Sequence, residues 1–506
     1  MSRPLYLTTT IPYVNAEPHI GFALEIVQAD VLARFHRLEG REVFFSTGTD
    51  EYGQKIFQAA QAEGEGGQDY VDRYAARFDD LKKVLNLSYD NFIRTSSPGH
   101  ITAAQEFWKL CDQNGDIYKK LYKGLYCVGC EKFLQARDLI NGKCPLHPSS
   151  EPEEIEEENY FFRFSRYSDD LIKYLSNERA IVPEWRRQEA LNLARELDDF
   201  SISRNRERLP WGVPVPGDES HVMYVWFGAF VNYISTLGWF HSAKASRDRP
   251  HSAKASRDKP SNLFEKFWQE GETIQMAGKD MVKFQSLMWQ AMLMSASATL
   301  KKGGSPAIKN TDTIFYHGFI ISGGTKMSKS LGNIINPLDL VCEYGTDAVR
   351  YFLLRHVHPV EDGDVTPESF KEIYNAHLAN GLGNLVSRIL KMAVTNDVVL
   401  PLSSEPNLSS ANVSEGAKLD DFEFNKAMDN IWEGVCGLDE EIERTQPFKK
   451  IKIDSREARA DILSLLTQLN QIAFRLQPFL PDTAAKIIDL ITKHQVPDTP
   501  LFPRKD

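Results

Sequence analysis

One short segment in the second half of the chain concentrates cations and hydroxyl groups. Ile321–Asn333 reads Ile-Ser-Gly-Gly-Thr-Lys-Met-Ser-Lys-Ser-Leu-Gly-Asn, with Lys326 and Lys329 three residues apart. Gly323 and Gly324 precede the lysines, and glycine adopts positive φ readily and lets the backbone approach a ligand closely. Clustered ammonium and hydroxyl donors on such a loop suit a polyphosphate. A bare Lys-x-x-Lys is more often a solvated loop, so other residues must decide.

A second group has the spacing of a metal site. Its members are Cys127, Cys130, Cys144 and His147, in the pattern Cys-x2-Cys-x13-Cys-x2-His. Three thiolates and one imidazole at paired spacings predict one tetrahedral, structural Zn²⁺, and four protein ligands leave no open position for a substrate. The alternative is a set of unrelated thiols near a chance histidine.

A third group combines histidine and glycine near the N-terminus, in the sequence His19-Ile20-Gly21-Phe22. A glycine where a strand turns into a helix allows a nucleotide to approach, and the helix N-terminus attracts phosphate. Taken alone, His-x-Gly is more often a surface histidine whose hydrogen bonds are satisfied.

The elements that position these residues follow from periodicity. Residues 4–10 predict a strand, residues 20–38 carry apolar side chains at spacings of three and four that predict a helix, and residues 42–45 predict a second strand. Strand, helix and strand make a βαβ unit and a parallel sheet, which binds ligands beyond the carboxyl ends of its strands. His19 and Asp50 both fall at such ends.

Further strand-like stretches, at 221–227, 273–276 and 314–320, predict that the Rossmann-like α/β domain resumes after an insertion. From residue 366 onward three apolar stripes at helical spacing predict an all-α bundle. The expected domains are 1–115 (first catalytic half), 116–200 (connective insertion with the zinc knuckle), 201–320 (second catalytic half), 321–365 (lysine loop and stem-contact segment) and 366–506 (helical domain). Within them, the tandem decamer at 241–260 has no apolar residue larger than alanine and predicts a mobile surface loop.

Composition limits the possible classes of protein. The chain has 506 residues, 42% of them hydrophobic, and a net charge of −11. This charge argues against a general nucleic-acid coat protein, which binds by neutralising phosphates. Six cysteines make no disulfide framework, and no apolar run predicts a membrane span or a signal peptide, so we expect a cytoplasmic enzyme.

Together these motifs resemble those of the class I aminoacyl-tRNA synthetases. Lys-Met-Ser-Lys-Ser resembles their phosphate loop, and His19–Phe22 resembles their His-Ile-Gly-His motif, with Phe22 in place of the last histidine. Within the class, the chain is most similar to the methionyl-tRNA synthetase family, and the likeness runs nearly end to end. The matching stretches include Ile11-Pro-Tyr-Val-Asn-Ala, Phe45-Ser-Thr-Gly-Thr-Asp-Glu, the cysteine knuckle, Ser201-Ile-Ser-Arg, Tyr224-Val-Trp-Phe and Gly278-Lys-Asp.

The resemblance implies roles for individual residues. The methionine-binding positions are Ile11, Tyr13, Asp50, Arg204, Trp226, Ala229 and Tyr233. Asp50 would hold the substrate ammonium and Arg204 its carboxylate. The ATP-binding positions are His19, Gly21, Gly278, Asp280, Lys326 and Lys329, of which His19, Gly21, Lys326 and Lys329 would also serve catalysis, with Mg²⁺ accompanying ATP. Gly228 and Gln285 depart from the family, which usually has aspartate and histidine there.

In the helical domain the resemblance implies an anticodon-binding site at Asn384, Arg388 and Phe448. Asn384 and Arg388 lie one helical turn apart, which by itself is more often a solvated polar face. The expected partners are methionine, ATP and tRNA(Met), and the expected state is a monomer. Two alternatives stay open: another class I synthetase, and a catalytically weak paralogue that binds RNA, for which the departures at Phe22, Gly228 and Gln285 are the motivation.

Overall fold

The computed structural model describes residues 2–128, 132–134, 139–145, 151–239, 262–327, 333–401 and 418–506. Its internal contacts divide the chain into two compact units. Unit 1 consists of Met1–Glu17, Glu42–Asp80 and Tyr89–Tyr316, and unit 2 of Pro18–Arg41, Leu81–Ser88 and His317–Asp506. Of the predicted features, the decamer repeat, Cys130, His147 and Lys329 lie outside the described residues.

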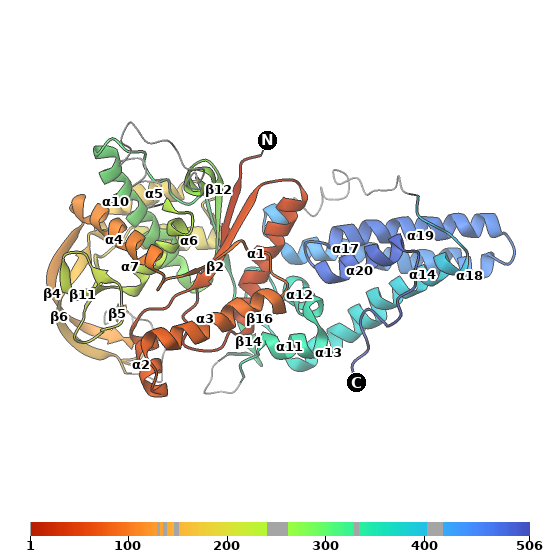
Figure 1. Cartoon of the computed structure of the whole chain (residues 1–506), viewed down its shortest axis with the longest axis horizontal. Coiled ribbons are helices and arrows are strands. Elements are labelled where there is room, and N and C mark those ends of the chain that lie inside the picture. The colour runs from red at the N-terminus through yellow and green to blue at the C-terminus, as the bar shows by residue number, and fades with distance from the viewer. Residues whose placement is uncertain are drawn as a thin grey trace, which may run out of the picture. The chain divides into compact units, whose positions relative to one another are not determined.

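A six-stranded sheet organises unit 1 (Figure 1), with strand order β3-β2-β1-β12-β13-β7. The strands are β1 (Leu5–Thr8), β2 (Val43–Thr49), β3 (Asn91–Arg94), β7 (Ile181–Val182), β12 (Glu272–Gly278) and β13 (Thr313–His317). β1 pairs in parallel with both β2 and β12, so the two sequence halves join at the centre of the sheet. The parallel α/β sheet is therefore confirmed. The edge strand β7 comes from the segment expected to form the insertion.

Two smaller antiparallel sheets complete the strands of unit 1. One has the order β5-β4-β6-β8, with β4 (Ile117–Cys127), β5 (Lys132–Leu134), β6 (Glu153–Phe162) and β8 (Phe200–Ser201). The other has the order β10-β11-β9, with β9 (Ser203–Asn205), β10 (Pro214–Val215) and β11 (Asp218–Met223). The strand predicted at 221–227 is wrong beyond Met223, because Val225 begins a helix that packs Phe227 and Phe230 into the core.

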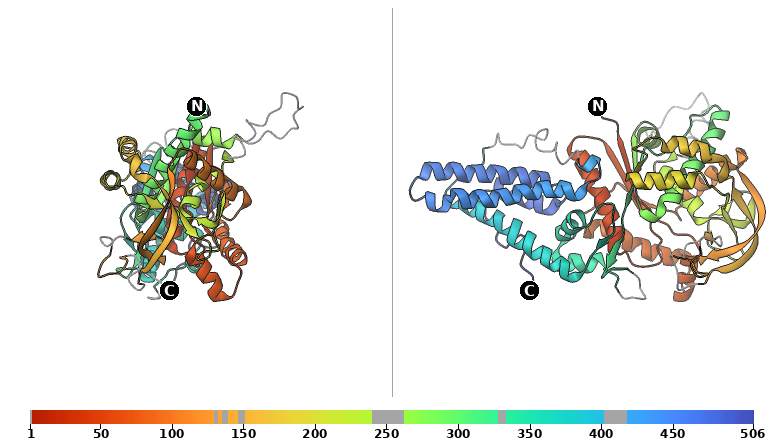
Figure 2. Two further views of the ribbon diagram at one scale, coloured as in Figure 1. Left: turned by 90° about the vertical axis from the view of Figure 1, so that its left-hand side faces the viewer. Right: turned by 180° about the vertical axis from the view of Figure 1, so that it is seen from behind.

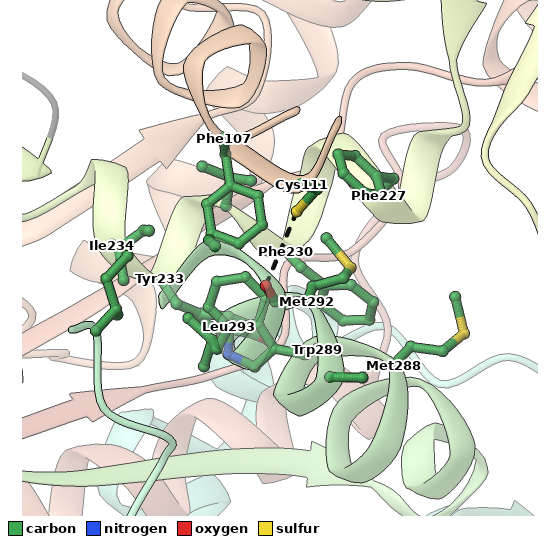
Figure 3. Packing of buried hydrophobic residues seen from close by; sticks show 14 of the residues in the cluster. Phe107, Cys111, Phe227, Phe230, Tyr233, Ile234, Met288, Trp289, Met292 and Leu293 are labelled. Carbon is green, nitrogen blue, oxygen red and sulfur yellow. Dashed lines mark hydrogen bonds between the residues drawn. The ribbon is translucent and has the colours of Figure 1, made fainter. Parts of the chain in front are cut away.

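The helices of unit 1 bury aromatic side chains against one another. They are α2 (Gln54–Glu63), α3 (Gly67–Val84), α4 (Pro98–Gln113), η3 (Phe164–Tyr167), α5 (Ser168–Leu175), α6 (Glu184–Ala194), α7 (Val225–Phe230), α8 (Asn232–Ser235), η4 (Phe264–Gln269), η5 (Lys279–Met281), η6 (Val282–Met288) and α10 (Trp289–Lys302). Figure 3 shows the centre of this core, where Phe107 of α4 meets Trp289 of α10 with 5.7 Å between ring centroids. Cys111 is a buried thiol here, pointing at the Met292 carbonyl.

Unit 2 is mainly helical. Its helices are α1 (Ile20–Leu38), α11 (Pro337–Tyr344), α12 (Thr346–Arg355), α13 (Pro367–Ile373), η8 (Tyr374–Gly383), α14 (Asn384–Thr395), α17 (Phe424–Thr445), α18 (Pro447–Lys450), α19 (Ser455–Leu476) and α20 (Pro481–Thr492). A small sheet of order β15-β14-β16 accompanies them, with β14 (Ile320–Ser322), β15 (Thr325–Lys326) and β16 (Gly363–Asp364). Helices α14, α17, α19 and α20 lie side by side in both Figure 1 and Figure 2, and the predicted apolar stripes are buried between them.

A buried ion pair fixes α1 within unit 2. The Arg350 guanidinium of α12 is fully buried and lies 2.8 Å from Asp30 of α1. The same guanidinium donates to the carbonyl oxygens of Leu85, Pro478 and Phe479. Helix α1 is thereby tied to residues from three other parts of the chain.

Among the described residues, no helix has both the length and the apolar character needed to cross a membrane.

Candidate functional site

Two neighbouring strands of unit 1 deliver the predicted amino-acid-binding residues to one place. The chain leaving β1 runs beside the end of β2, where Tyr13 and Asp50 form an isolated bridge. The Asp50 amide donates to the Pro12 carbonyl over 2.9 Å. Because both strands are parallel, their carboxyl ends meet, and the expectation that Asp50 lies at this edge is confirmed. Its side chain is 3% exposed and accepts a hydrogen bond from Thr95.

Aromatic rings surround this place. Trp226 of α7 meets Tyr13 edge-on at 5.9 Å between ring centroids and stacks on Phe284 at 4.8 Å. The indole Nε1 of Trp226 is buried without a hydrogen-bond partner among the described residues. Ala229 and Tyr233 follow Trp226 in the sequence, and both are buried. The structure thus brings Tyr13, Trp226 and Asp50 together, as a pocket for a thioether beside a carboxylate requires.

A small cavity adjoins the Asp50 carboxylate. It is lined by Asp50, Tyr52, Thr95, His100, Val213, Met223, Tyr224, Val225, Gly228 and Ala229. Gly228 creates part of this space, since a Cβ built on it would meet only Val213, at 4.0 Å. His100 is 1% exposed, and its Nε2 has no hydrogen-bond partner among the described residues. Burial lowers the pKa of His100 to about 4, so the ring is neutral at pH 7.

Sequence reasoning missed His100 and a second group beside Asp50. Glu51 is fully buried and receives both donors of the Arg94 fork, at 2.6 and 2.9 Å. Its own backbone amide donates to Thr95, and its carbonyl accepts from Trp211. A bidentate buried pair of this kind holds the turn rigid and fixes the neighbouring Asp50. The only signal in the sequence that could have indicated Glu51 was its place directly after Asp50.

Gln285 takes part in a chain of buried amides. The Tyr233 hydroxyl donates to Gln285 Oε1 over 3.1 Å, and Gln285 Nε2 donates to Gln275 Oε1 over 3.0 Å. Thr311 donates to the same Gln275 oxygen. Gln285 therefore orients the Tyr233 ring through a group that does not titrate, which gives this departure from the family a structural role.

Arg204 lies on β9, where its guanidinium donates to Ser201 Oγ and to the Ser203 carbonyl. It is 5% exposed and sits against the rings of Tyr126 and Tyr224, 4.9 and 4.7 Å from their centroids. Tyr224 also lines the cavity beside Asp50, so one ring separates the guanidinium from that cavity. Burial alone lowers the pKa of Arg204, but the two tyrosines outweigh it and the net shift is upward.

The end of β12 carries the other predicted nucleotide-binding residues of unit 1. Gly278 is the last residue of the strand and is buried, and Asp280 follows in η5 with its side chain exposed. β12 is the direct neighbour of β1 in the sheet. Both residues therefore lie at the carboxyl edge of the parallel strands, where nucleotide ligands of such sheets bind.

In unit 2, His19 and Gly21 form the start of α1. His19 is the N-cap, and its Nδ1 accepts a hydrogen bond from the Gly21 amide over 3.1 Å. Since Nδ1 accepts, the neutral ring carries its proton on Nε2. A Cβ at position 21 would lie 2.9 Å from His19 Cε1. Glycine is therefore required by the imidazole as well as by any nucleotide.

The lysine segment of unit 2 is a hairpin. β14 and β15 are antiparallel and join through Gly323 and Gly324, which have φ of +62° and +74°. Positive φ at both central positions is the tight-turn geometry that glycine makes cheap, so the predicted glycine role is confirmed. The hairpin ends at Lys326, and the next residue, Met327, reaches within 4.0 Å of the Cβ position of Gly21. The lysine segment and the His19 motif thus meet.

The two described cysteines of the predicted knuckle come together. Cys127 ends β4 and pairs with Lys132 of the antiparallel strand β5. Cys127 and Cys144 are 3% and 1% exposed and share a small buried cluster with Leu134. A turn at Asn141 and Gly142 precedes Cys144. Among the described residues, the two thiols of the predicted knuckle are thus buried in one cluster.

Arg388 and Asn384 lie on α14, one turn apart. Asn384 is exposed, and the Arg388 guanidinium is paired with two carboxylates of α17, Asp439 at 2.5 Å and Glu443 at 2.8 Å. Phe448 of α18 is 44% exposed, with the Lys449 ammonium 5.7 Å from its ring centroid. These ion pairs lie at the surface, so they are compatible both with a solvated polar face and with a site that binds a ligand.

Comparison with known proteins agrees with this arrangement. The parallel sheet, the His-Ile-Gly helix start and the lysine hairpin define a class I aminoacyl-tRNA synthetase, and the family model for tRNA synthetases class I (M) matches residues 5–154 and 146–390.

Relatives narrow the class. The methionine–tRNA ligase of Rhizobium meliloti is 38% identical over 97% of this chain and 92% of its own length. That of Thermosynechococcus vestitus is 39% identical over 96% of this chain and 90% of its own length. The solved structure of Mycobacterium tuberculosis methionyl-tRNA synthetase in complex with methionyl-adenylate superposes with a TM-score of 0.86, at 34% identity, covering 99% of this chain and 100% of that one. This chain belongs to the methionyl-tRNA synthetase family.

Proposed function

We propose that this protein is a methionine–tRNA ligase of protein biosynthesis. It activates methionine with ATP to methionyl-adenylate and transfers the methionyl group to the 3′-terminal ribose of tRNA(Met). The observation that carries the proposal is the convergence of Tyr13, Trp226 and Asp50 at the carboxyl ends of β1 and β2. A polarizable thioether suits the aromatic walls, and a buried carboxylate suits the ammonium group.

The activation step follows from these groups. A carboxylate oxygen of methionine attacks the α-phosphorus of ATP, and the bond from that phosphorus to the bridging oxygen breaks as pyrophosphate leaves. His19 Nε2, the Gly21 backbone and the ammonium groups of Lys326 and Lys329 stabilise charge that develops on the phosphates. Mg²⁺ accompanies ATP and neutralises phosphate charge when bound. In the second step the ribose hydroxyl attacks the carbonyl carbon of the adenylate, and AMP leaves.

Remaining residues orient the substrates. Asp50 holds the methionine ammonium, and Ile11, Ala229 and Tyr233 complete the apolar pocket. Arg204 holds the carboxylate, which requires that its guanidinium reach past Tyr224. Gly278 and Asp280 contact the ATP ribose. Positioning and electrostatics suffice for both steps, so no side-chain nucleophile is needed.

We further propose one structural Zn²⁺ in the knuckle, held by Cys127, Cys130, Cys144 and His147. The burial of Cys127 beside Cys144 supports this ligand set, since adjacent thiols suit a thiophilic metal. The ion would crosslink two turns of the insertion. It would supply folding energy and no catalytic chemistry.

The helical bundle is the proposed anticodon-binding site, where Asn384 and Arg388 hydrogen-bond to base edges and Phe448 stacks on a base. We propose a monomer, supported by exposed large apolar side chains that are scattered over separate elements of the described chain. A cytoplasmic location fits the exposed free thiols of Cys342 and Cys436.

The test is ATP–pyrophosphate exchange with the zinc-loaded full chain. We expect exchange that methionine stimulates and the other amino acids do not. Stimulation by a different amino acid would identify another class I synthetase. Absence of exchange, together with retained tRNA binding, would identify an RNA-binding paralogue instead.

A further inference from the structure

A buried histidine–carboxylate pair lies at the base of the lysine hairpin. His317 Nε2 is 2.7 Å from Glu25 Oε2, and the two residues are 5% and 4% exposed. His317 Nδ1 is 2.7 Å from the Gly318 carbonyl oxygen. A carbonyl oxygen only accepts, so Nδ1 carries a proton, and the 2.7 Å contact of Nε2 with the carboxylate holds a second one. The pair is therefore a charge-assisted hydrogen bond that is shielded from water.

Both ends of the hairpin face the same side of α1. Gly21 and Glu25 are four residues apart on this helix and so share one face. Glu25 bonds to His317, the last residue of β13, three residues before β14 begins, and the Cβ position of Gly21 contacts Met327, directly after β15. The turn that bears His19 and the hairpin that ends at Lys326 thus contact the same face of α1.

The opposite side of the hairpin is fixed as well. β14 pairs with β16, and a Cβ at Gly318 would lie 2.1 Å from the Glu361 carbonyl oxygen. Asp362 and Asp364 accept from the Phe319 and Gly324 amides. These contacts fix the hairpin to β16. Its position relative to α1 then depends on the contacts between the hairpin segment and that helix. The His317–Glu25 hydrogen bond joins the segment before the hairpin to α1, and both side chains are buried.

We propose that His317 and Glu25 are positioning residues for the adenylation step, which hold the β14–β15 hairpin against the helix that begins after His19. Neither residue touches substrate, and both act through the hairpin. This inference rests on the proposed function. A lysine that acts mainly on transition-state charge must be placed accurately, because small displacements of such groups cost rate more than ground-state binding.

The first experiment measures ATP–pyrophosphate exchange for the full-length variants His317→Ala, Glu25→Ala and Glu25→Gln. We expect the two alanine variants to lose about tenfold or more in kcat. Their methionine affinity, followed by tryptophan fluorescence, should stay within about twofold. Glu25→Gln should recover most of the rate, since its amide N–H can donate to His317 Nε2 once that nitrogen is neutral. The matched control is His36→Ala, which removes a 6% exposed histidine near Glu39 and Asp420 from the last turn of the same helix. It should leave kcat unchanged.

The second experiment separates positioning from general destabilisation. Glu25→Ala is combined with Lys326→Ala, and the two losses should be strongly non-additive if the pair acts through the hairpin. Hydrogen exchange of Ile320–Lys326 should quicken in the alanine variants and not in His36→Ala. Additive losses, equal losses in His36→Ala, or unchanged kcat in Glu25→Ala would each overturn the inference. An inactive wild type would instead overturn the proposed function, and the exchange measurement would still report on the pair.

Discussion

Replacing Arg350 by methionine tests how α1 is held in place. The guanidinium is 0% exposed, and it makes an ion pair with Asp30 and hydrogen bonds to three backbone carbonyls. Methionine keeps most of the apolar stem and removes all four interactions. Removal of one partner from a buried pair typically costs about 3–5 kcal/mol, because the other charge stays buried. Asp30 keeps Arg34 and Ser88 as partners, which reduces the loss.

We therefore expect Arg350→Met to lower the free energy of unfolding of unit 2 by about 4 kcal/mol. Urea denaturation followed by fluorine NMR of 5-fluorotryptophan-labelled protein measures this loss. Trp432 is the one tryptophan that unit 2 contributes, and its resonance reports that unit. The control is Lys493→Met, which breaks an exposed pair with Asp489 at 2.8 Å and should cost less than about 1 kcal/mol.

The effect has a defined pH dependence. Burial raises the pKa of Asp30, but Arg350 and Arg34 outweigh it, so the net pKa is below the usual value. Asp30 therefore stabilises the fold above the pKa of an unfolded aspartate, about 3.9, and this stability is lost as pH falls through the lower, folded value. Without Arg350, burial raises the pKa of Asp30 with less opposition, so Asp30 takes up a proton at a higher pH in the variant. The difference in free energy of unfolding between wild type and variant should therefore shrink as pH falls from 7 toward 3. A loss below about 1 kcal/mol at pH 7, or a deficit that grows on acidification, would refute this reasoning.

Four further predictions follow from individual sites. Gly228→Ala should raise the melting temperature and increase the free energy of unfolding by about 0.5–1 kcal/mol, because position 228 is helical and the added Cβ meets only Val213 at 4.0 Å. A lower melting temperature would mean that the space beside residue 228 is already occupied. Metal analysis should find about one zinc per chain, and Cys127→Ser should release it; a metal-free, reduced and folded protein would remove the knuckle. Lys329→Ala should reduce adenylate formation far more than methionine affinity, and equal losses would argue against a transition-state role. Asp439→Asn should strengthen tRNA binding about threefold by loosening the hold on Arg388, whereas Arg388→Ala should weaken it; no change in either filter-binding assay would exclude this surface.

Local patterns let the sequence predict much of this fold. The helix at 20–38 has the predicted bounds, because its apolar spacing is a property of one segment. The double glycine of the lysine hairpin is at positive φ as its chemistry requires. The parallel pairing of β1 with β2 followed from the βαβ rule. Where local pattern misled, at 224–227, the aromatic and β-branched residues that suggested a strand are used to pack a helix into the core.

The sequence by itself identified the candidate groups whose members are close together along the chain. These are the histidine–glycine turn, the lysine hairpin, the cysteine spacing and the Asn384–Arg388 turn. Only the tertiary structure decided which distant groups support them. His317 and Glu25 are 292 residues apart, and the Arg94 fork on Glu51 joins two strands. His100 lines a cavity together with Gly228 and Asp50, which lie on other parts of the chain. Such pairs cannot be recognised from the spacing of residues in the sequence. Each polar side chain finds its partner only when the whole chain has folded, because burial is a property of the fold rather than of one segment.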